Sequence, residues 1–282
     1  MQFPDTLVLG ATGRIGRLLQ LFWTRAPFGE RVLWQGRGLI GLEQAAHRVV
    51  FGPLQEPEHL RQAATGRQIL CLAGGIPGRG DLNDNWHLAE AALRATPPGG
   101  RVILCSSSAV YGNQPGLLNE ATPPRPATDY GAAKFDMEQR SAALAARLGV
   151  RLCVLRIGNI AGLDAILGGW RPGFQLDQFA DDSTPARSYI GVAILTQVLA
   201  VLLALPQLPE VINLAQPGLV EMGALLDVAG LGWTGRPASD TAIARVVLDT
   251  GLLQDLVPVP EADAAQMVQQ WRRVEPDILG DH

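Results

Sequence analysis

The first half of the sequence alternates short apolar runs, rich in β-branched residues, with longer segments of helical periodicity. Several runs are apolar at consecutive positions, which is typical of strands covered on both faces. The expected strands are 6–9, 31–35, 48–51, 68–73, 101–106 and 150–156, and the expected helices are 14–26, 56–64, 86–95 and 130–148. This alternation predicts an α/β fold built on a Rossmann-type doubly wound parallel sheet.

The first expected strand runs into GATGRIG, a G-x-x-G-x-x-G loop that opens the first expected helix. Glycines permit a tight turn and let backbone N–H groups approach a pyrophosphate, whose charge the helix N-terminus also favours. The loop therefore predicts dinucleotide binding. The expected contacts are Gly10, Thr12, Gly13, Arg14, Ile15 and Gly16.

The end of the second expected strand bears on the choice of cofactor. A site for NAD usually has an acid there, which accepts hydrogen bonds from the ribose hydroxyls, but residues 33–38 read LWQGRG. Arg37 offers a guanidinium group where the 2′-phosphate of NADP would lie. A solvated surface arginine would look the same, so NAD and NADP both stay open, with NADP slightly favoured.

Tyr130 and Lys134 are four positions apart in an expected helix, so both side chains project from one face. A tyrosine with a pKa of about 10 is a poor acid or base at neutral pH, but an adjacent cation stabilises the phenolate. Lys134 is also the only lysine in a chain with 22 arginines. The pair predicts an acid/base tyrosine assisted by an ammonium group.

A third motif, SSSAVYG at 106–112, follows the expected strand 101–106. Hydroxyl groups at the carboxyl end of a parallel strand face the crevice where doubly wound sheets bind ligands. One of these serines could therefore hydrogen-bond a substrate carbonyl or alcohol.

Together the three motifs resemble the extended short-chain dehydrogenase/reductase superfamily, particularly its NAD-dependent epimerase/dehydratase group. The resemblance covers residues 6–214 and includes Asn85, Asn119-Glu120-x-x-Pro123, LRIGNIAG from Leu155 and RSYIGV from Arg187. It implies Tyr130 as the general acid/base, Lys134 as the ribose-binding residue that lowers the tyrosine pKa, and Ser107 as the substrate-orienting hydroxyl.

The resemblance also implies further contacts. Those to the cofactor are Leu54, Leu72, Ala73 and Gly74, and those to the substrate are Ser107, Ser108, Asn159 and Arg187. The chain departs from the family pattern at Gly52-Pro53-Leu54, where relatives often have Gly-Asp-Leu. RSYIGV lacks the usual acidic and histidine positions, and GGWRPG stands in a short stretch where relatives have a long helical insert. These departures predict a trimmed substrate pocket.

The regular alternation ends after Gly158 and gives way to a stretch rich in glycine and proline, 162–185. The apolar segment 191–205 is too short to span a bilayer and is expected to form a buried helix. We expect a dinucleotide-binding domain at residues 1–160, including the Tyr130/Lys134 helix. Residues 161–282 are expected to form a small substrate-binding and capping region that completes the same fold.

Composition argues against other classes of protein. The net charge of −4 and the absence of a basic run argue against a nucleic-acid partner. Cys71, Cys105 and Cys153 lie in apolar runs without metal-ligand spacing, so we expect reduced core thiols, no metal site and a cytoplasmic protein. No signal peptide is apparent, no membrane partner is expected, and a homodimer is possible.

The expected function is hydride transfer at a hydroxyl or carbonyl carbon of a sugar-like or nucleotide-sugar substrate, by an NAD(P)-dependent oxidoreductase or epimerase. Two alternatives stay open: an NADPH-dependent ketone or aldehyde reductase, and a non-catalytic NAD(P)-sensing regulatory protein. The intact Tyr130/Lys134 pair favours an enzyme.

Overall fold

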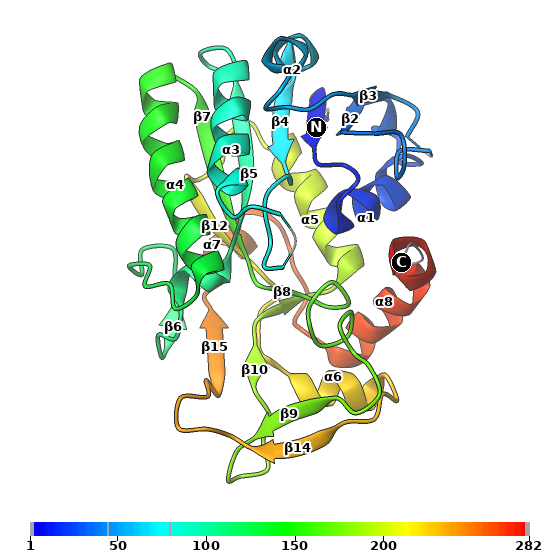
Figure 1. The fold of residues 1–282 in the computed structure, drawn as a ribbon, viewed down its shortest axis with the longest axis vertical. Helices are drawn as coiled ribbons and strands as arrows, with labels where there is room; N and C mark the ends of the chain where they lie inside the picture. The colour runs from blue at the N-terminus through cyan, green and yellow to red at the C-terminus, as the bar shows by residue number, and fades with distance from the viewer. Residues whose placement is uncertain (1–2, 44, 79, 280–282) are drawn as a thin grey trace.

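The central sheet has seven strands, in the order β12-β7-β5-β4-β1-β2-β3 (Figure 1). The computed structural model describes residues 3–43, 45–78 and 80–279. Every neighbouring pair in the sheet is parallel, which confirms the predicted doubly wound parallel sheet. The strands are β1 (Thr6–Leu9), β2 (Val32–Gly36), β3 (Arg48–Val50), β4 (Gln68–Cys71), β5 (Arg101–Ser107), β7 (Arg151–Ile157) and β12 (Val211–Leu214).

Helices cover both faces of this sheet. Alternate residues of a strand point to opposite faces, so Leu7 and Leu9 join one core cluster and Val8 joins the other. The cluster with Leu7 includes α2 (Pro57–Ala64), α3 (Asp84–Ala95) and α4 (Asp129–Leu148). The cluster with Val8 includes α1 (Arg14–Trp23), α5 (Val192–Ala204), α7 (Gly251–Leu256) and α8 (Ala264–Leu279).

Smaller elements lie beyond the carboxyl ends of the central strands, in the lower part of Figure 1. A third core cluster holds several of them together and includes Tyr189, Leu225 and Trp271, with the partly buried Trp170 and Phe174 packed against it. The elements are β6 (Leu117–Leu118), β8 (Asn159–Ile160), β9 (Gln175–Gln178), β10 (Ala186–Arg187), β11 (Tyr189–Ile190), β13 (Val220–Glu221), α6 (Met222–Val228), β14 (Thr234–Pro237) and β15 (Arg245–Leu248). Two 3₁₀ turns, Gly29–Arg31 and Ser108–Tyr111, complete the chain's regular structure among the described residues.

The expected elements of the first half form with small shifts at their ends. The first helix is shorter than expected: it ends at Trp23, whose buried indole donates to the Thr196 carbonyl of α5. The apolar segment 191–205 forms the buried helix α5, and within the described residues no helix has the length and apolarity that a bilayer crossing requires. The three cysteines are buried and unpaired, as expected.

Candidate active site

The glycine loop joins β1 to α1 at the carboxyl edge of the sheet, and two of its glycines are required by the geometry. Gly10 has φ +81°, and a Cβ there would lie 2.8 Å from the Ala73 backbone nitrogen. A Cβ on Gly16 would lie 2.3 Å from the Ala11 carbonyl oxygen. No side chain caps the first turn of α1, so its free N–H groups suit an anion such as a pyrophosphate.

The other predicted cofactor residues lie on both sides of this loop. Ala73 contacts Gly10, and the Leu72 amide donates to the Leu9 carbonyl at 3.0 Å, so residues 72–74 line the same edge. Arg37 is exposed directly after β2, next to Gly36, which lies against the Thr12 methyl group. The structure therefore groups the glycine loop, Arg37 and residues 72–74.

Leu54 lies apart from that group in a surface groove of α2 and α3, together with Pro53 and His87, and is 38% exposed. A residue that sequence reasoning did not select supports the loop instead: Gln35, buried at the end of β2, accepts the Gly10 N–H at 3.1 Å and donates to the Phe51 carbonyl. Its only sequence signal was its place at the end of the second strand.

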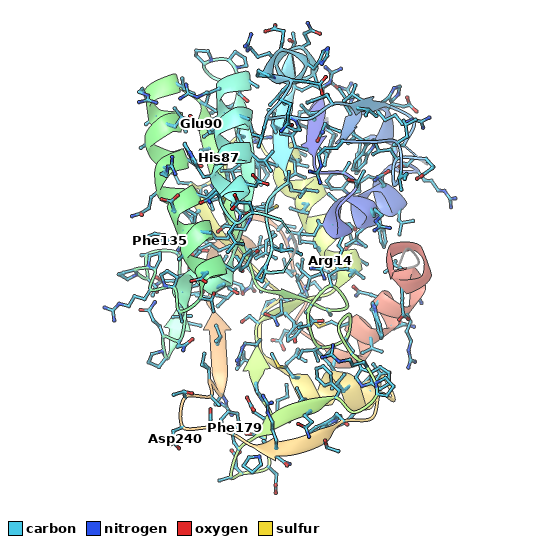
Figure 2. The ribbon with its side chains drawn as sticks, viewed as in Figure 1. Arg14, His87, Glu90, Phe135, Phe179 and Asp240 are labelled. Atoms are coloured by element: carbon cyan, nitrogen blue, oxygen red, sulfur yellow. The ribbon has the colours of Figure 1, made fainter. Side chains whose placement is uncertain are left out.

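Arg14, the first residue of α1, links the glycine loop to the substrate side of the molecule. Its Nη1 donates to the Leu163 carbonyl at 2.7 Å, and Figure 2 shows it between the central sheet and the lower elements. Burial raises the pKa of Tyr130, and the positive charge of Arg14 opposes that rise. Arg14 thus acts electrostatically on the tyrosine as well as lying at the dinucleotide loop.

Three predicted catalytic side chains, Ser107, Tyr130 and Lys134, come together at the end of β5. Thr128 caps α4 by accepting the Gly131 N–H at 3.1 Å, which starts the helix just before Tyr130. Lys134 is 6% exposed; its Nζ donates to the Cys105 carbonyl at 2.8 Å and lies 5.8 Å from the centre of the Tyr130 ring. Ser107 hydrogen-bonds the Tyr130 phenol.

The pKa directions at Tyr130 and Lys134 follow from the burial of both side chains. Burial raises the pKa of Tyr130 and the nearby Cys105 thiol adds to the rise, whereas Ser107 and Arg14 oppose it. Burial also lowers the pKa of Lys134. Desolvation of the phenolate outweighs the favourable charges on it, and the effect of Lys134 on the tyrosine pKa stays a prediction.

Asn85 on α3 is a polar neighbour of Lys134 that was noted only as part of the family resemblance. Its Nδ2 donates to the Gly75 and Leu82 carbonyls at 3.0 and 2.9 Å. Its Oδ1 is buried and has no hydrogen-bond partner among the described residues. A Cβ on Gly74 would lie 2.3 Å from this oxygen and 3.5 Å from Lys134 Nζ. The oxygen is therefore placed to accept a hydrogen bond from a water or ligand beside the lysine.

A buried ion pair lies one turn further along α4. Glu138 accepts hydrogen bonds from Arg156 Nε and Nη2 at 3.1 and 2.8 Å, and both residues are buried. Ser106 also donates to Glu138, while Arg156 Nη1 donates to the Tyr111 hydroxyl at 3.0 Å. The pair thereby fixes residues on both sides of Ser107.

The predicted substrate residues do not share one set of contacts. Asn159 hydrogen-bonds the buried Tyr189 phenol, which donates to Asp164 at 2.9 Å. Arg187 donates to the carbonyls of Ala186, Ile243 and Ala244 and lines a separate hollow of about 480 Å³. That hollow also contains Arg171 and Arg236.

Ser108 is half-buried and begins the 3₁₀ turn directly after Ser107. Of the substrate candidates, Ser107 and Ser108 are nearest to Tyr130 in the sequence.

Comparison with solved structures places this arrangement among known folds. UDP-glucuronic acid 4-epimerase from Bacillus cereus, in complex with UDP-glucuronic acid and NAD, has a TM-score of 0.75, 16% identity and coverage of 96% of this chain and 98% of that chain. dTDP-glucose 4,6-dehydratase from Bacillus anthracis, in complex with NAD, has a TM-score of 0.72 and 18% identity, and the match covers 96% and 97% of the two chains. These similarities show the fold.

UDP-N-acetylglucosamine 4-epimerase from Methanobrevibacter ruminantium, in complex with UDP-N-acetylmuramic acid, is also similar, with a TM-score of 0.72, 18% identity and 98% and 100% coverage. A search of curated proteins returned no match. The family model described as "NAD dependent epimerase/dehydratase family" matches residues 6–166, which include the glycine loop, Ser107, Tyr130 and Lys134. The chain belongs to the NAD-dependent epimerase/dehydratase family.

Proposed function

We propose that the chain is an NAD(P)-dependent oxidoreductase or epimerase that acts at a hydroxyl-bearing carbon of a sugar-like or nucleotide-sugar substrate. The observation that carries this proposal is the meeting of Ser107, Tyr130 and Lys134 at the end of β5, beside the glycine loop. We assign Tyr130 as the general acid/base and Ser107 as the hydroxyl that orients the substrate oxygen.

The residues present fit a dinucleotide. Gly10 and Gly16 let the loop pack closely against Ala73 and Ala11, and among the described residues no side chain caps the first turn of α1, which leaves N–H groups for a pyrophosphate. Lys134 has a buried positive charge, and the Asn85 oxygen beside it has no partner among the described residues, so both can bind ribose hydroxyls or water. When bound, the nicotinamide supplies the hydride acceptor or donor.

The electrostatics assign the proton to Tyr130 in the free chain. Because burial raises its pKa, the phenol is protonated at neutral pH and is ready to donate a proton to a substrate oxygen. To accept a proton it must ionise, and the Ser107 hydrogen bond and the Arg14 charge stabilise that phenolate. Ser107 can contact the same substrate oxygen, which holds it within reach of the phenol.

The cofactor is NAD or NADP. Structures of similar fold contain NAD, which supports NAD. Arg37, exposed at the end of β2 where the sequence has no acid, supports NADP and with it a second candidate function, an NADPH-dependent ketone or aldehyde reductase. An epimerase returns its cofactor oxidised, whereas a reductase consumes NADPH in proportion to product, so product analysis separates the two.

We further propose that residues 161–282 bind and cap the substrate, with Ser108, Asn159 and Arg187 as candidate contacts. The hollow around Arg187 contains three arginines and one carboxylate, Asp177, which pairs with Arg236, and this excess of positive charge supports an anionic group on the substrate. The hydrogen bonds of Asn159 and Arg187 within the protein favour roles in shaping this region.

The first test replaces Tyr130 with Phe, which removes the hydroxyl and keeps the ring. We expect turnover on a panel of sugar and carbonyl substrates to fall about 10²- to 10⁴-fold, with dinucleotide affinity retained. Asp129→Asn, an exposed change at the preceding residue, is the matched control. Unchanged turnover in Tyr130→Phe would remove the proposed mechanism, and tight cofactor binding without any hydride transfer would favour the sensor alternative.

A further inference from the structure

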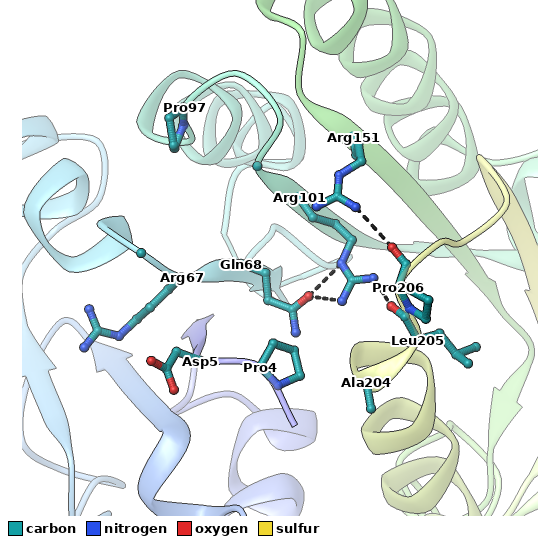
Figure 3. A pocket seen from close by; sticks show the side chains of 12 residues that line it. Pro4, Asp5, Arg67, Gln68, Pro97, Arg101, Arg151, Ala204, Leu205 and Pro206 are labelled. Atoms are coloured by element: carbon teal, nitrogen blue, oxygen red, sulfur yellow. Dashed lines mark hydrogen bonds between the residues drawn. The ribbon is translucent and has the colours of Figure 1, made fainter. Parts of the chain in front are cut away.

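A second hollow, of about 500 Å³, lies at the end of the central sheet where β5 begins with Arg101 (Figure 3). Arg101 is the first residue of β5 and Ser107 is the last, so the hollow and the catalytic serine are separated by the length of that strand. The lining includes Asp5, Arg67, Gln68, Arg101, Arg151 and Leu205. None of the proposed catalytic or cofactor residues is among them.

Arg101 forms the inner wall of this hollow and is only 7% exposed. Its guanidinium donates to the Gln68 side-chain oxygen and to the Leu203 and Leu205 carbonyls at the end of α5. These acceptors are uncharged, so they satisfy its hydrogen bonds without neutralising its charge. Burial lowers the pKa of Arg101, and the positive charge of Arg151 lowers it further. Two arginines therefore repel each other across this site.

Arg151 and Arg67 bring further positive charge to the rim. Arg151 donates from Nε to the Gly99 carbonyl at 3.0 Å and from Nη1 to the Pro206 carbonyl at 3.1 Å, which leaves Nη2 for a ligand. Arg67 uses Nη1 for the carbonyls of Ala63 and Thr65 and retains its other nitrogens.

Asp5 is the one carboxylate in the lining, and it is already paired with Arg31 at 3.1 Å. The hollow thus holds three guanidinium groups and one carboxylate, an excess of two positive charges before Arg31 is considered.

We propose that this hollow binds the phosphate group of a small molecule, at a site separate from the dinucleotide and substrate sites. A phosphomonoester carries a charge of about −1.5 to −2 at pH 7, which matches the excess positive charge of the lining, whereas a single carboxylate would leave part of it uncompensated. Guanidinium groups bind phosphate oxygens through paired N–H donors, and the rim arginines keep such donors free.

The test measures binding of inorganic phosphate by calorimetry, at constant ionic strength and with the dinucleotide site saturated. We expect Arg151→Gln and Arg67→Gln each to weaken phosphate binding about tenfold, through loss of a hydrogen bond to a charged group. Arg151→Lys should retain part of the affinity. Asp5→Asn should tighten binding, because it removes the only negative charge of the lining and frees Arg31. Arg101 is left unchanged, because it holds the end of α5.

Arg273→Gln is the matched control, because it removes an exposed arginine of α8 that is not part of this lining. Its phosphate affinity should equal that of the unmodified protein. If all variants bind phosphate equally, or if chloride at the same ionic strength competes as well as phosphate, the arginines only hydrogen-bond the backbone carbonyls around them and the proposed site is wrong. The outcome is independent of the proposed enzymatic function, because no hydride transfer is measured.

Discussion

Two buried cations beside the candidate active site differ in how their charge is balanced. Lys134 and Arg156 are 6% and 5% exposed, and both contact the chain around Ser107, through the Cys105 carbonyl and the Tyr111 hydroxyl respectively. Arg156 is paired with the buried carboxylate of Glu138. Lys134 donates a hydrogen bond to the carbonyl of Cys105 and has the Cys71 and Cys105 thiols as neighbours.

The pKa directions follow from this difference. Burial lowers the pKa of Arg156, but the hydrogen bonds and charge of Glu138 outweigh burial and raise it. Burial dominates at Lys134 and lowers its pKa, since Glu138 acts on it only weakly. A compensated buried charge maintains the fold, whereas an uncompensated one opposes folding and is available to a ligand. We therefore expect Arg156 to stabilise the fold, and we propose Lys134 as a binding residue.

Breaking the compensated pair should have the largest effect on stability. Arg156→Met leaves Glu138 buried without its cation, and we expect the free energy of unfolding to fall by about 3–5 kcal/mol. The double variant Arg156→Met/Glu138→Leu removes both charges and should recover most of that loss. Urea denaturation measures both values. A single variant as stable as the parent protein would contradict the structural role of the pair.

Replacing Lys134, the cation without a paired carboxylate, should lower turnover and leave stability nearly unchanged. Lys134→Met loses the hydrogen bond to Cys105 but also removes a desolvated charge, so the free energy of unfolding should change by no more than about 1 kcal/mol. Turnover should fall by about 10²-fold or more, as expected for loss of a preorganised charged donor. Dinucleotide titration and steady-state kinetics test this prediction. Strong destabilisation with normal turnover of the folded fraction would reverse the assignment of the two cations.

Asp164 is a buried acid, as Lys134 is a buried base. Its replacement should have the smallest effect of the three, and that effect is on the pH dependence of stability. Burial raises its pKa above the usual value, although the Tyr189 hydroxyl and backbone N–H groups oppose the rise. The folded chain therefore binds its proton more tightly than the unfolded chain does. The resulting stabilisation is present at pH values below the usual carboxyl pKa and is lost as pH rises through the raised value.

Asp164→Asn cannot lose a proton, so its stability should fall less than that of the parent protein as pH rises above the usual carboxyl pKa. Unfolding curves at several pH values provide the measurement, and other titrating groups are common to both proteins. Parallel pH profiles would show that the folded environment of Asp164 does not disfavour its ionised form.

Much of the fold and part of the site could be predicted from local patterns. The apolar runs predicted the parallel strands of the sheet, and GATGRIG predicted the loop between β1 and α1. The four-residue spacing of Tyr130 and Lys134 correctly placed both on α4, because helical periodicity relates residues that are near in sequence. The predicted end of the first helix was less accurate, because the packing of Trp23 on α5 depends on a segment far away in the sequence.

By itself, the sequence determined the order of strands and helices, the glycine loop and the positions of the hydroxyl, phenol and ammonium groups. Only the tertiary structure decided the charge balance: it paired Glu138 with Arg156, placed Lys134 against Cys105, left the Asn85 oxygen without a partner among the described residues and gathered arginines around Arg101. The physical reason is that burial and charge compensation depend on side chains contributed by separate strands and helices, whereas periodicity and spacing are properties of one segment.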